Sequence, residues 1–419
     1  MSPVRPTVHV VGRRLEPEHY RLRDQLTRTA QPYEWHEAGS PEADELLARY
    51  GAAGAELPVL IDEEGAHAGV SLERLFELWH VLSPPARQDY DIAIVGAGPA
   101  GLGAAVYAAS DGLSTLLLER DVPGGQASHT SLIENFFGFP EGIGGAELSR
   151  RAGRQAERFG TELVFHGVVG HASQPDGTHR LDLNEGHHVT ARALLAAPGM
   201  DWRRLDVDGV DELLGRGVYY GAGRSEAMQC GGDDVLVVGA GNSAGQAVMN
   251  LAGAGARVTM LVRGDRLGKT MSAYLVERIE AHPEIEVRYS TQVRELHAGE
   301  QLEAVTVEGP DKPERVRAAA LFLCIGGQPR TGWAAGAGVE LDPAGYILTG
   351  PDLLEQGRRP DRWPLDRDPL ALEMSMPGVF AAGDVRHGST KRVAGAVGEG
   401  SMAAALAHRR LEELARPLR

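Results

Sequence analysis

The chain has 419 residues, a formal net charge of −16 and two cysteines, with 42% hydrophobic and 24% charged residues. This length predicts two or three domains, because single hydrophobic cores stop growing near roughly 250–300 residues. The negative charge argues against sequence-independent binding to nucleic acid or anionic lipid, and two cysteines as far apart as Cys230 and Cys324 exclude a disulfide framework and a thiolate metal cluster.

The N-terminal run MSPVRPTVHVVGRRLEPEHY contains no long apolar segment of the signal-peptide kind, so we expect a soluble, cytoplasmic protein. The apolar stretch Val235–Val262 raises the question of a membrane span. Asn242 and Asn250 interrupt it, however, and its glycines suit a nucleotide-binding turn better. We therefore expect no membrane contact, and no metal ligands stand out.

The N-terminal segment, 1–85, is predicted to form a small α/β domain. In chain order, the pattern predicts a strand at Thr7–Gly12, a helix at His19–Thr29, a strand at Tyr33–Ala38, a helix at Glu42–Tyr50, a strand at Leu57–Asp62 followed by a hairpin, and a helix at Ser71–Val81 capped by Ser71. This order, with Pro58 opening the third strand, resembles the thioredoxin or glutaredoxin fold, in which that proline is cis. The segment after the first strand, GRRLEPEHY, has no cysteine, so we expect a dimerisation or docking module without dithiol chemistry.

A linker, SPPARQ, leads into a buried-type strand that turns directly into an alanine-rich helix. Gly96 makes the tight turn, Gly98 lets the backbone approach a pyrophosphate, and Gly101 lets helix and strand pack closely. The helix begins at Pro99 and Ala100, where free N–H groups and a partial positive charge favour phosphate. These residues predict a dinucleotide site.

A second strand, Ser114–Glu119, follows this helix and ends in an acid. A carboxylate in this place accepts hydrogen bonds from a ribose hydroxyl, so Glu119 and the neighbouring Arg120 are predicted cofactor contacts. Strand, turn, helix, strand and acid in this order predict a Rossmann unit.

Three further motifs resemble those of the low-molecular-weight thioredoxin reductases, which are FAD-dependent pyridine nucleotide oxidoreductases. They are Gly124-Gly125-Gln126, the run IENFFGFP at 133–140 and the run GVFAAGDV at 378–385. The resemblance covers about Tyr90–Leu414 and implies that FAD binds in the first Rossmann unit.

Carried over onto this sequence, the resemblance also implies individual roles. Gln126, beside Gly125, and Asn135 would contact the isoalloxazine end of FAD, and Asp384, after Gly383, would bond the ribityl chain. Backbone N–H groups of Arg392, Val393 and Ala394 would reach the pyrimidine edge. A helix from about Ala394 to Leu414 would then start at the flavin and favour its reduced, anionic form.

A second Rossmann unit is predicted from Asp234. The strand Asp234–Val238 leads into a glycine turn and a helix, and the strand Ala256–Val262 follows. The predicted cofactor contacts at this turn are Gly239, Gly241, Asn242, Ser243 and Ala244.

Cations, not an acid, follow the second strand of this unit. A cation suits a 2′-phosphate, so Arg263 and Lys269 predict NADPH over NADH. The thioredoxin reductases carry two adjacent arginines and a third nearby. Here only Arg263 clearly matches, Gly264 replaces the second arginine, and Arg266 or Lys269 could substitute. A Rossmann-like domain without a cofactor is the alternative.

In the resembling family, a redox-active C-x-x-C precedes the second Rossmann strand and relays electrons from flavin to thioredoxin. Gly221 and Arg224 stand at the two matching positions. Disulfide exchange needs one thiolate to attack and another to resolve, so conventional thioredoxin reductase activity is excluded.

The catalytic candidates in the sequence are Cys230, His387, Arg224 and Tyr220. Cys230 could form a transient adduct but no internal disulfide, and Cys324 is expected in the core. His387 could act as an acid or base near the flavin. By family geometry, Tyr220 and Arg224, together with Tyr219, could shape a pocket for a small planar or anionic substrate.

The expected fold class is α/β, with two Rossmann-like three-layer domains and the small thioredoxin-like domain. The expected boundaries are 1–85 for the N-terminal domain, 89–200 with 322–419 for the FAD domain, and 201–321 for the NAD(P) domain. The segment Thr349–Pro369 is predicted to be an exposed excursion without an assigned purpose.

The leading hypothesis is an FAD-dependent oxidoreductase that passes hydride from NADPH to FAD and on to a non-disulfide acceptor, namely oxygen, a small molecule or a redox partner protein. One alternative is an NADPH-independent flavin oxidase of a small metabolite, and another is a non-catalytic flavin or nucleotide sensor. A homodimer formed through the FAD domains is expected, as in the resembling family.

Overall fold

The computed structural model describes residues 6–79, 83–221, 224–333 and 337–415. The chain divides into two compact units. One, here the Gly239 unit, contains residues up to 79, 129–133 and 202–326; the other, here the Gly96 unit, contains 83–128, 134–201 and 327–415, apart from the undescribed positions. No helix among the described residues is long and apolar enough to cross a membrane.

The N-terminal domain is a four-stranded sheet in the order β2-β1-β3-β4. Its elements are β1 (Val8–Gly12), α1 (Pro17–Arg28), β2 (Tyr33–Glu37), α2 (Pro41–Arg49), β3 (Val59–Asp62), β4 (Gly65–His67) and α3 (Leu72–Leu78). The predicted helices and strands are confirmed, with ends that differ by one to a few residues. The hydroxyl of Ser71 accepts the N–H of Arg74 and so caps α3, and the Leu57–Pro58 peptide bond is cis.

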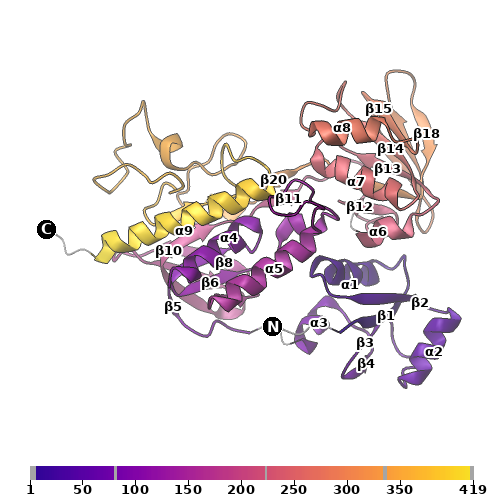
Figure 1. Ribbon diagram of the computed structural model, residues 1–419, viewed down its shortest axis with the longest axis horizontal. Coiled ribbons are helices and arrows are strands. Elements are labelled where there is room, and N and C mark those ends of the chain that lie inside the picture. Colours follow the sequence, from indigo (N-terminus) through magenta and orange to yellow (C-terminus); the bar gives the residue numbers. More distant parts are fainter. Residues whose placement is uncertain (1–5, 80–82, 222–223, 334–336, 416–419) are drawn as a thin grey trace. The chain divides into compact units, whose positions relative to one another are not determined.

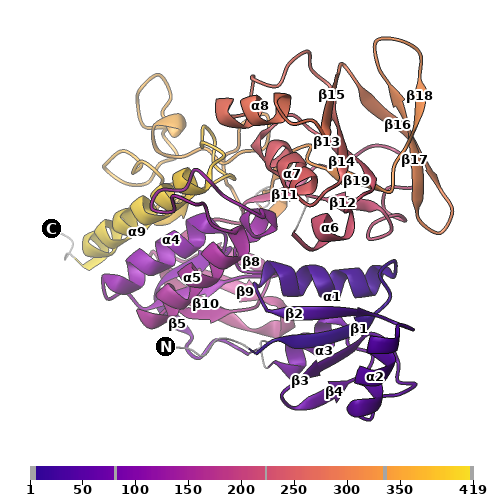
Figure 2. The same ribbon diagram turned by 45° about the vertical axis from the view of Figure 1, so that its right-hand side comes forward.

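This domain packs onto the second dinucleotide domain within the Gly239 unit, with α1 beside α6 (Figures 1 and 2). The guanidinium of Arg14 donates to the carbonyl of Gln229 at 3.0 Å, and the side chain of Arg216 donates to the carbonyl of Leu15 at 3.2 Å. The N-terminal domain, up to Trp79, therefore shares a compact unit with 202–326 and does not form a separate one.

The second dinucleotide domain has a parallel five-stranded sheet in the order β12-β19-β13-β14-β15 and a three-stranded antiparallel sheet, β16-β17-β18. Its elements are β12 (Val218–Tyr220), α6 (Arg224–Gln229), β13 (Asp234–Val238), α7 (Asn242–Gly253), β14 (Arg257–Val262), α8 (Ala273–Glu280), β15 (Ile285–Tyr289), β16 (Gln292–Ala298), β17 (Leu302–Glu308), β18 (Glu314–Arg317) and β19 (Ala320–Leu323). Because β19 pairs with both β12 and β13, it belongs wholly to this sheet, and the unit ends at Gly326 and not at residue 321 as expected.

The Gly96 unit contains a seven-stranded sheet whose main path is β7-β6-β5-β10-β9-β8, with β21 paired to β10. Its elements are β5 (Asp89–Val95), α4 (Pro99–Ser110), β6 (Thr115–Leu118), η1 (Gly125–His129), α5 (Gly145–Arg158), β7 (Glu162–Val164), β8 (Val168–Ser173), β9 (His179–Leu183), η2 (Asn184–Gly186), β10 (His188–Ala196), β20 (Gly327–Pro329), η4 (Gly350–Leu353), β21 (Val379–Ala381) and α9 (Val393–Ala415). A two-stranded sheet pairs β11 (Met200–Trp202) with β20.

The parallel strands at the centre of both sheets are buried on two faces, which explains their continuous apolar sequences. In β5, Ile92 and Ile94 point into the core beneath α4 and α9, while Ala93, between them, packs in the core on the opposite face. In β13, Val235 and Val237 face α7, whereas Leu236 lies in the core that β17 contributes to. Successive side chains of each strand therefore point alternately into two different cores.

Helices α4 and α9 pack closely although they come from opposite ends of the unit's sequence. A Cβ on Gly400 would lie 2.0 Å from the carbonyl oxygen of Ala100, and one on Gly103 would lie 3.0 Å from that of Val397. Glycine at these positions permits the two backbones to approach, and no larger residue fits at Gly400.

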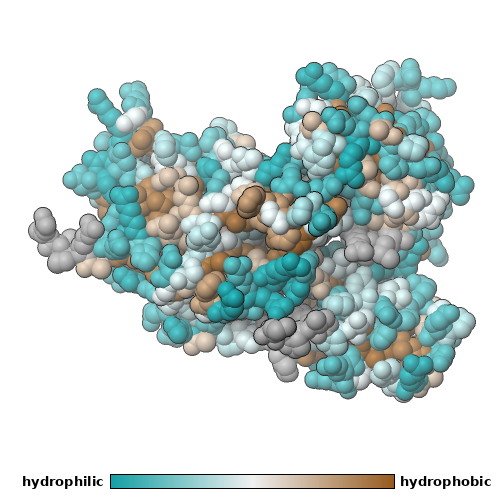
Figure 3. All heavy atoms as spheres, in the orientation of Figure 1, coloured by the Kyte–Doolittle hydropathy of each residue, from teal (hydrophilic) through white to brown (hydrophobic). Residues whose placement is uncertain are grey.

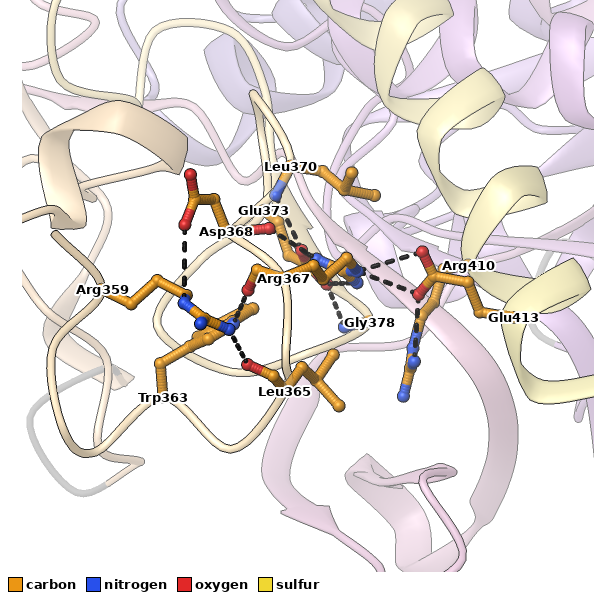
Figure 4. Close-up of polar contacts among 10 residues, drawn as sticks. All are labelled: Arg359, Trp363, Leu365, Arg367, Asp368, Leu370, Glu373, Gly378, Arg410 and Glu413. Atoms are coloured by element: carbon orange, nitrogen blue, oxygen red, sulfur yellow. Dashed lines mark hydrogen bonds and ion pairs between the residues drawn. The ribbon is translucent and has the colours of Figure 1, made fainter. Parts of the chain in front are cut away.

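The excursion predicted at Thr349–Pro369 is tied to the core by an ion-pair network (Figure 4). Glu373, fully buried, accepts Arg367 at 2.6 Å and the backbone N–H groups of Leu370 and Gly378 at 2.9 Å each. Arg367 also pairs with Glu413 of α9 at 3.0 Å. The buried carboxylate is therefore fully bonded, and the end of the excursion is fastened to the C-terminal helix.

Candidate functional site

The first glycine turn, between β5 and α4, has the backbone geometry that a dinucleotide site needs. Gly96 has φ +103°, and a Cβ there would lie 2.3 Å from the carbonyl oxygen of Ala197. A Cβ on Gly101 would lie 1.8 Å from the carbonyl oxygen of Gly96. At Gly98, the N-cap of α4, a Cβ would meet nothing within 4 Å, and no side chain caps the helix. The turn is therefore packed on its inner side and open where a pyrophosphate would lie.

Glu119 lies at this turn, as its spacing predicted. It is 7% exposed, and its carboxylate accepts the N–H groups of Ala97 at 2.7 Å and of Arg120 and Asp121 at 2.9 Å. Burial raises the pKa of Glu119, partly offset by the backbone donor Ala97. The carboxylate is thus held rigidly next to the open face of the turn, where a ribose hydroxyl can donate to it.

Gln126 and Asn135 differ in how firmly they are held. The amide of Gln126 donates to the carbonyl of Met200 at 3.0 Å, close to Gly327, where a Cβ would lie 3.5 Å from that amide nitrogen. Gly125, before it, has φ +52° and lies against Gly98. Asn135 is exposed. The structure brings Gln126 to the glycine turn through Gly125, and leaves Asn135 at the surface.

The Gly383–Asp384 turn is supported by a residue that the sequence analysis missed. Glu399 of α9 accepts the N–H of Gly383 at 2.8 Å and pairs with Arg386 at 2.7 Å. Burial raises the pKa of Asp384, and the nearby Lys391 charge opposes that shift. Glu399 stands alone in the small apolar run VAGAVGEGSMAAALA, and that isolated acid was the available signal.

Helix α9 begins at Val393, as expected, with Arg392 and Ala394 exposed beside it. The N–H of Arg392 bonds the carbonyl of Thr390 at 2.6 Å, and Lys391 donates to the carbonyl of Asp384. These bonds join the start of α9 to the Gly383–Asp384 turn.

The second glycine turn repeats the first in the Gly239 unit. Gly239 has φ +145°, and a Cβ there would lie 2.3 Å from the carbonyl oxygen of Cys324. At Gly241, the N-cap of α7, a Cβ would meet nothing within 4 Å, and no side chain caps the helix. Ser243 and Ala244 follow in the first turn of α7, with Ala244 buried. This turn is also open at its phosphate position.

The loop after β14 presents cations at the surface and is bonded to the turn. The side chain of Asn242 accepts the N–H of Ser272 at 2.7 Å, and Thr270 donates to the carbonyl of Ala240 at 3.1 Å. Lys269 is paired with Asp265 at 2.8 Å. Arg263 and Arg266 are exposed, and within the described part of the chain neither has an ion-pair partner.

The position of the missing dithiol holds a glycine against aromatic side chains. Gly221 has φ +76°, and its Cβ position lies 3.7 Å from His129 and 3.9 Å from Trp202. The side chain of Arg224 lies outside the described residues. Tyr219 is buried, stacked on Phe322 with ring centroids 5.3 Å apart.

Two of the suggested pocket residues, Tyr219 and Tyr220, make contacts within the Gly239 unit. Tyr219 also meets Tyr20 of α1 edge-on at 5.3 Å, so within this unit its ring packs against both Phe322 and Tyr20, and its role at a flavin-facing pocket stays a prediction. The hydroxyl of Tyr220 accepts the N–H of Leu205 at 3.2 Å. Both rings therefore serve packing within this unit.

The remaining catalytic candidates differ in access. Cys230 is 3% exposed, and burial raises its pKa to about 11, which disfavours the thiolate that a redox role requires. Cys324 is buried as expected, with its pKa raised by burial to about 12. His387 bonds the carboxylate of Asp342 at 2.7 Å and remains half-exposed.

Residues 90–400 match the family described as pyridine nucleotide-disulphide oxidoreductase. The chain is 32% identical over 336 residues to a thioredoxin reductase of Bacillus subtilis (strain 168), covering 79% of this chain and 97% of that protein. The structure of Lactococcus lactis thioredoxin reductase superposes with a TM-score of 0.68 at 29% identity, covering 77% of this chain and 99% of that one. That of T. acidophilum thioredoxin reductase gives 0.67 at 27% identity, covering 78% and 100%.

The family typically binds FAD and NAD(P)H, and the two open glycine turns suit two such nucleotides. The chain has two cysteines in all, both described and buried, and no C-x-x-C pair. The chain therefore belongs to the pyridine nucleotide-disulphide oxidoreductases, as an FAD-dependent oxidoreductase of thioredoxin reductase type that lacks the redox dithiol.

Proposed function

We propose that the protein takes a hydride from NADPH through FAD and passes the electrons to an acceptor other than a disulfide. The observation that carries this proposal is the combination of two intact glycine turns with a dithiol position occupied by Gly221 and Arg224. Disulfide exchange has no attacking or resolving thiolate here. Oxygen, a small molecule and a redox partner protein are the acceptors compatible with that loss.

The residues of the Gly96 unit support FAD in the first turn. Gly98 leaves room for a pyrophosphate at the N-terminus of α4, where the helix dipole favours negative charge. Glu119, bonded to Ala97 at this turn, would accept a ribose hydroxyl, and Asp384 would bond the ribityl chain, as the resemblance to the thioredoxin reductases implies. Glu399 holds the turn that presents Asp384.

The residues of the Gly239 unit support NADPH in the second turn. Gly241 leaves the corresponding space at α7, and Arg263 and Arg266 have no ion-pair partner within the described residues, so they can pair with a 2′-phosphate. Lys269 contributes less, because Asp265 already neutralises it. Bound FAD and NADPH supply the hydride and electron transfer themselves, while the chain binds and orients them.

The first experiment is anaerobic stopped-flow absorbance at the oxidised flavin band, with NADPH and NADH compared on protein that holds FAD. Fast bleaching that is faster with NADPH is the expected result. A protein holding full FAD that neither nucleotide bleaches contradicts the proposal. Bleaching by a small metabolite alone would then identify the flavin oxidase, and resistance to any reductant of this kind would identify a sensor.

We further propose that the protein works in the cytoplasm as a homodimer formed through the Gly96 unit. Hydrophobic side chains gather over and beside α9 in Figure 3, and Tyr107 of α4 and Met402 of α9 are 52% and 53% exposed. Light scattering of the full chain tests the assembly, and a monomer at micromolar concentration would contradict it.

A further inference from the structure

Two histidines and a glutamate of the N-terminal domain bring their ligand atoms together at one edge of its sheet. Strands β1 and β2 are parallel, with His9 opposite Glu34, and His36 lies two positions further along β2. Because side chains alternate along a strand, all three project from the same face. Val11, on that face of β1, packs in a core with Ala43 of α2, so this is the face that α2 partly covers.

Two of the spacings among these atoms match those around a tetrahedral ion. Nδ1 of His9 lies 3.2 Å from Nε2 of His36 and 3.3 Å from a carboxylate oxygen of Glu34. All three ligand atoms lie within 4.8 Å of one another. Ligands bound tetrahedrally at about 2.0–2.1 Å stand about 3.3–3.4 Å apart. The nitrogen of His9 therefore stands from each of the other two ligand atoms at about the distance that a shared tetrahedral ion gives.

Hydrogen bonds among His9, Glu34 and His36 cannot pair all three facing atoms, because too few of these atoms carry a hydrogen. A neutral imidazole carries one N–H, and an ionised carboxylate carries none. If His9 Nδ1 bears the proton, one N–H faces both the His36 nitrogen and the Glu34 oxygen. If His36 donates instead, the lone pair of His9 faces the Glu34 carboxylate. A cation, by contrast, accepts all three lone pairs at once.

The surroundings favour a cation, because Glu42 in the first turn of α2 adds a second negative charge near His36. The side chains of His9 and Glu34 are 32% and 62% exposed, so an ion can enter from solvent.

We propose that His9, Glu34 and His36 form a transition-metal site of the Zn²⁺-binding class, with its fourth position open to water or to Glu42. Two imidazoles and a carboxylate suit this class better than Ca²⁺ or Mg²⁺, which prefer oxygen ligands only. The ion would join the edge strand β2 to β1, on a domain that has no thiol chemistry of its own. The proposal does not depend on the flavin reaction.

A second gathering, His166, Glu185 and His187, provides an internal comparison. Nδ1 of His166 bonds the side-chain oxygen of Asn184 at 2.7 Å, and that oxygen also accepts the N–H of Gly167 at 3.1 Å. This histidine is therefore already held by a bond within the protein, and its replacement tests whether any bound metal lies there.

The test is equilibrium dialysis of the FAD-containing full chain, stripped with a chelator, against micromolar Zn²⁺, with bound metal measured by elemental analysis. We expect one equivalent per chain, and at least about tenfold weaker binding in each of His9→Gln, Glu34→Gln and His36→Gln. His67→Gln, on β4 of the same sheet and bonded to Asp62, and His166→Gln are the matched controls and should bind as the unchanged protein does.

Absence of bound Zn²⁺, unchanged binding in both His9→Gln and His36→Gln, or loss in His166→Gln alone would overturn the proposal. A second measurement needs no variant and so does not depend on their folding. Acylation of histidines by diethyl pyrocarbonate, mapped by mass spectrometry, should be suppressed by Zn²⁺ at His9 and His36 but not at His67. Equal acylation of His9 and His36 with and without Zn²⁺ would contradict the site.

Discussion

The two glycine turns of this chain share their first two glycines and differ in the third small residue and in the residue after the second strand. Gly96 and Gly239 both have positive φ and lie against the carbonyl of the residue that follows a strand, while Gly98 and Gly241 both leave open space at a helix N-terminus. These shared glycines suit the phosphates that any dinucleotide carries.

The differences lie at the third small residue and after the second strand. Gly101 admits no Cβ, whereas Ala244 already carries one. The first unit places the buried Glu119 after its second strand, and the second places the exposed Arg263 there. On the proposed assignment, the charge of this one residue would distinguish a free ribose hydroxyl in the first turn from a 2′-phosphate in the second.

The largest effect is expected from filling the open space of each turn separately. Gly98→Val should weaken FAD binding at least about 100-fold, since it removes the approach of two charge-assisted hydrogen bonds worth about 1.5–3 kcal/mol each. Gly241→Val should keep FAD but abolish reduction by NADPH. Flavin absorbance of the purified protein and its bleaching by NADPH measure both.

The paired variants control for each other, because a Cβ at either position meets nothing within 4 Å and should leave the fold intact. Circular dichroism should therefore match the unchanged protein. Loss of FAD from Gly241→Val, or normal FAD content in Gly98→Val, would show that the two turns do not hold the nucleotides assigned to them.

The next effect concerns the third small residue. Gly101→Ala places a Cβ 1.8 Å from the Gly96 carbonyl oxygen, so overpacking should lower the free energy of unfolding by about 1–3 kcal/mol. The reverse change in the second turn, Ala244→Gly, creates no clash and should cost about 0.5–1 kcal/mol through helix propensity. Chemical denaturation compares them, and equal costs would contradict the difference between the turns.

A smaller effect is expected from the cations after β14. Arg263→Ala should reduce the preference for NADPH over NADH about tenfold, because it removes a charge-assisted hydrogen bond. Lys269→Ala is the matched control and should change the preference less, since Asp265 already pairs with Lys269. Titration of flavin reduction by each nucleotide measures both, and an equal loss for NADPH and NADH in Arg263→Ala would exclude a 2′-phosphate contact.

The smallest effect is an expected absence of thiol reactivity. Burial raises the pKa of Cys230 to about 11 and of Cys324 to about 12, so both remain protonated at pH 8–9, where an ordinary thiol begins to ionise. Iodoacetamide should label neither in the native protein at pH 8.5 and both after denaturation. Labelling of Cys230 should rise only as the pH approaches 11, and fast labelling at pH 8.5 would restore it as a redox candidate.

Local pattern was enough to predict the turns and most of the elements. Glycine spacing predicted Gly96, Gly98 and Gly101, and strand length predicted Glu119, because these contacts lie within one βαβ unit. Glu399 was missed, since its partner Gly383 lies in a separate turn and no pattern links a helix acid to that turn.

Longer-range packing was harder to predict. Tyr219 was expected at a pocket, yet it stacks on Phe322 from a neighbouring strand and meets Tyr20 from the N-terminal domain. Periodicity shows that a residue faces a core but not which distant segment completes that core. The same limit applies to Arg367, whose buried partner Glu373 fastens a segment that composition marked only as exposed.

The close fit of α4 against α9 has a consequence for the order in which the chain is completed during synthesis. The backbone at Ala100 packs against Gly400, near the C-terminus. The Gly96 unit, whose glycine turn leaves the ribosome first, therefore cannot complete its packing until nearly the whole chain has been synthesised. Residues 202–326 are contiguous and can form their sheet earlier, together with the N-terminal domain. The first glycine turn is thus synthesised early, but the unit that contains it is completed last. A chain truncated before α9 would expose the apolar face of α4.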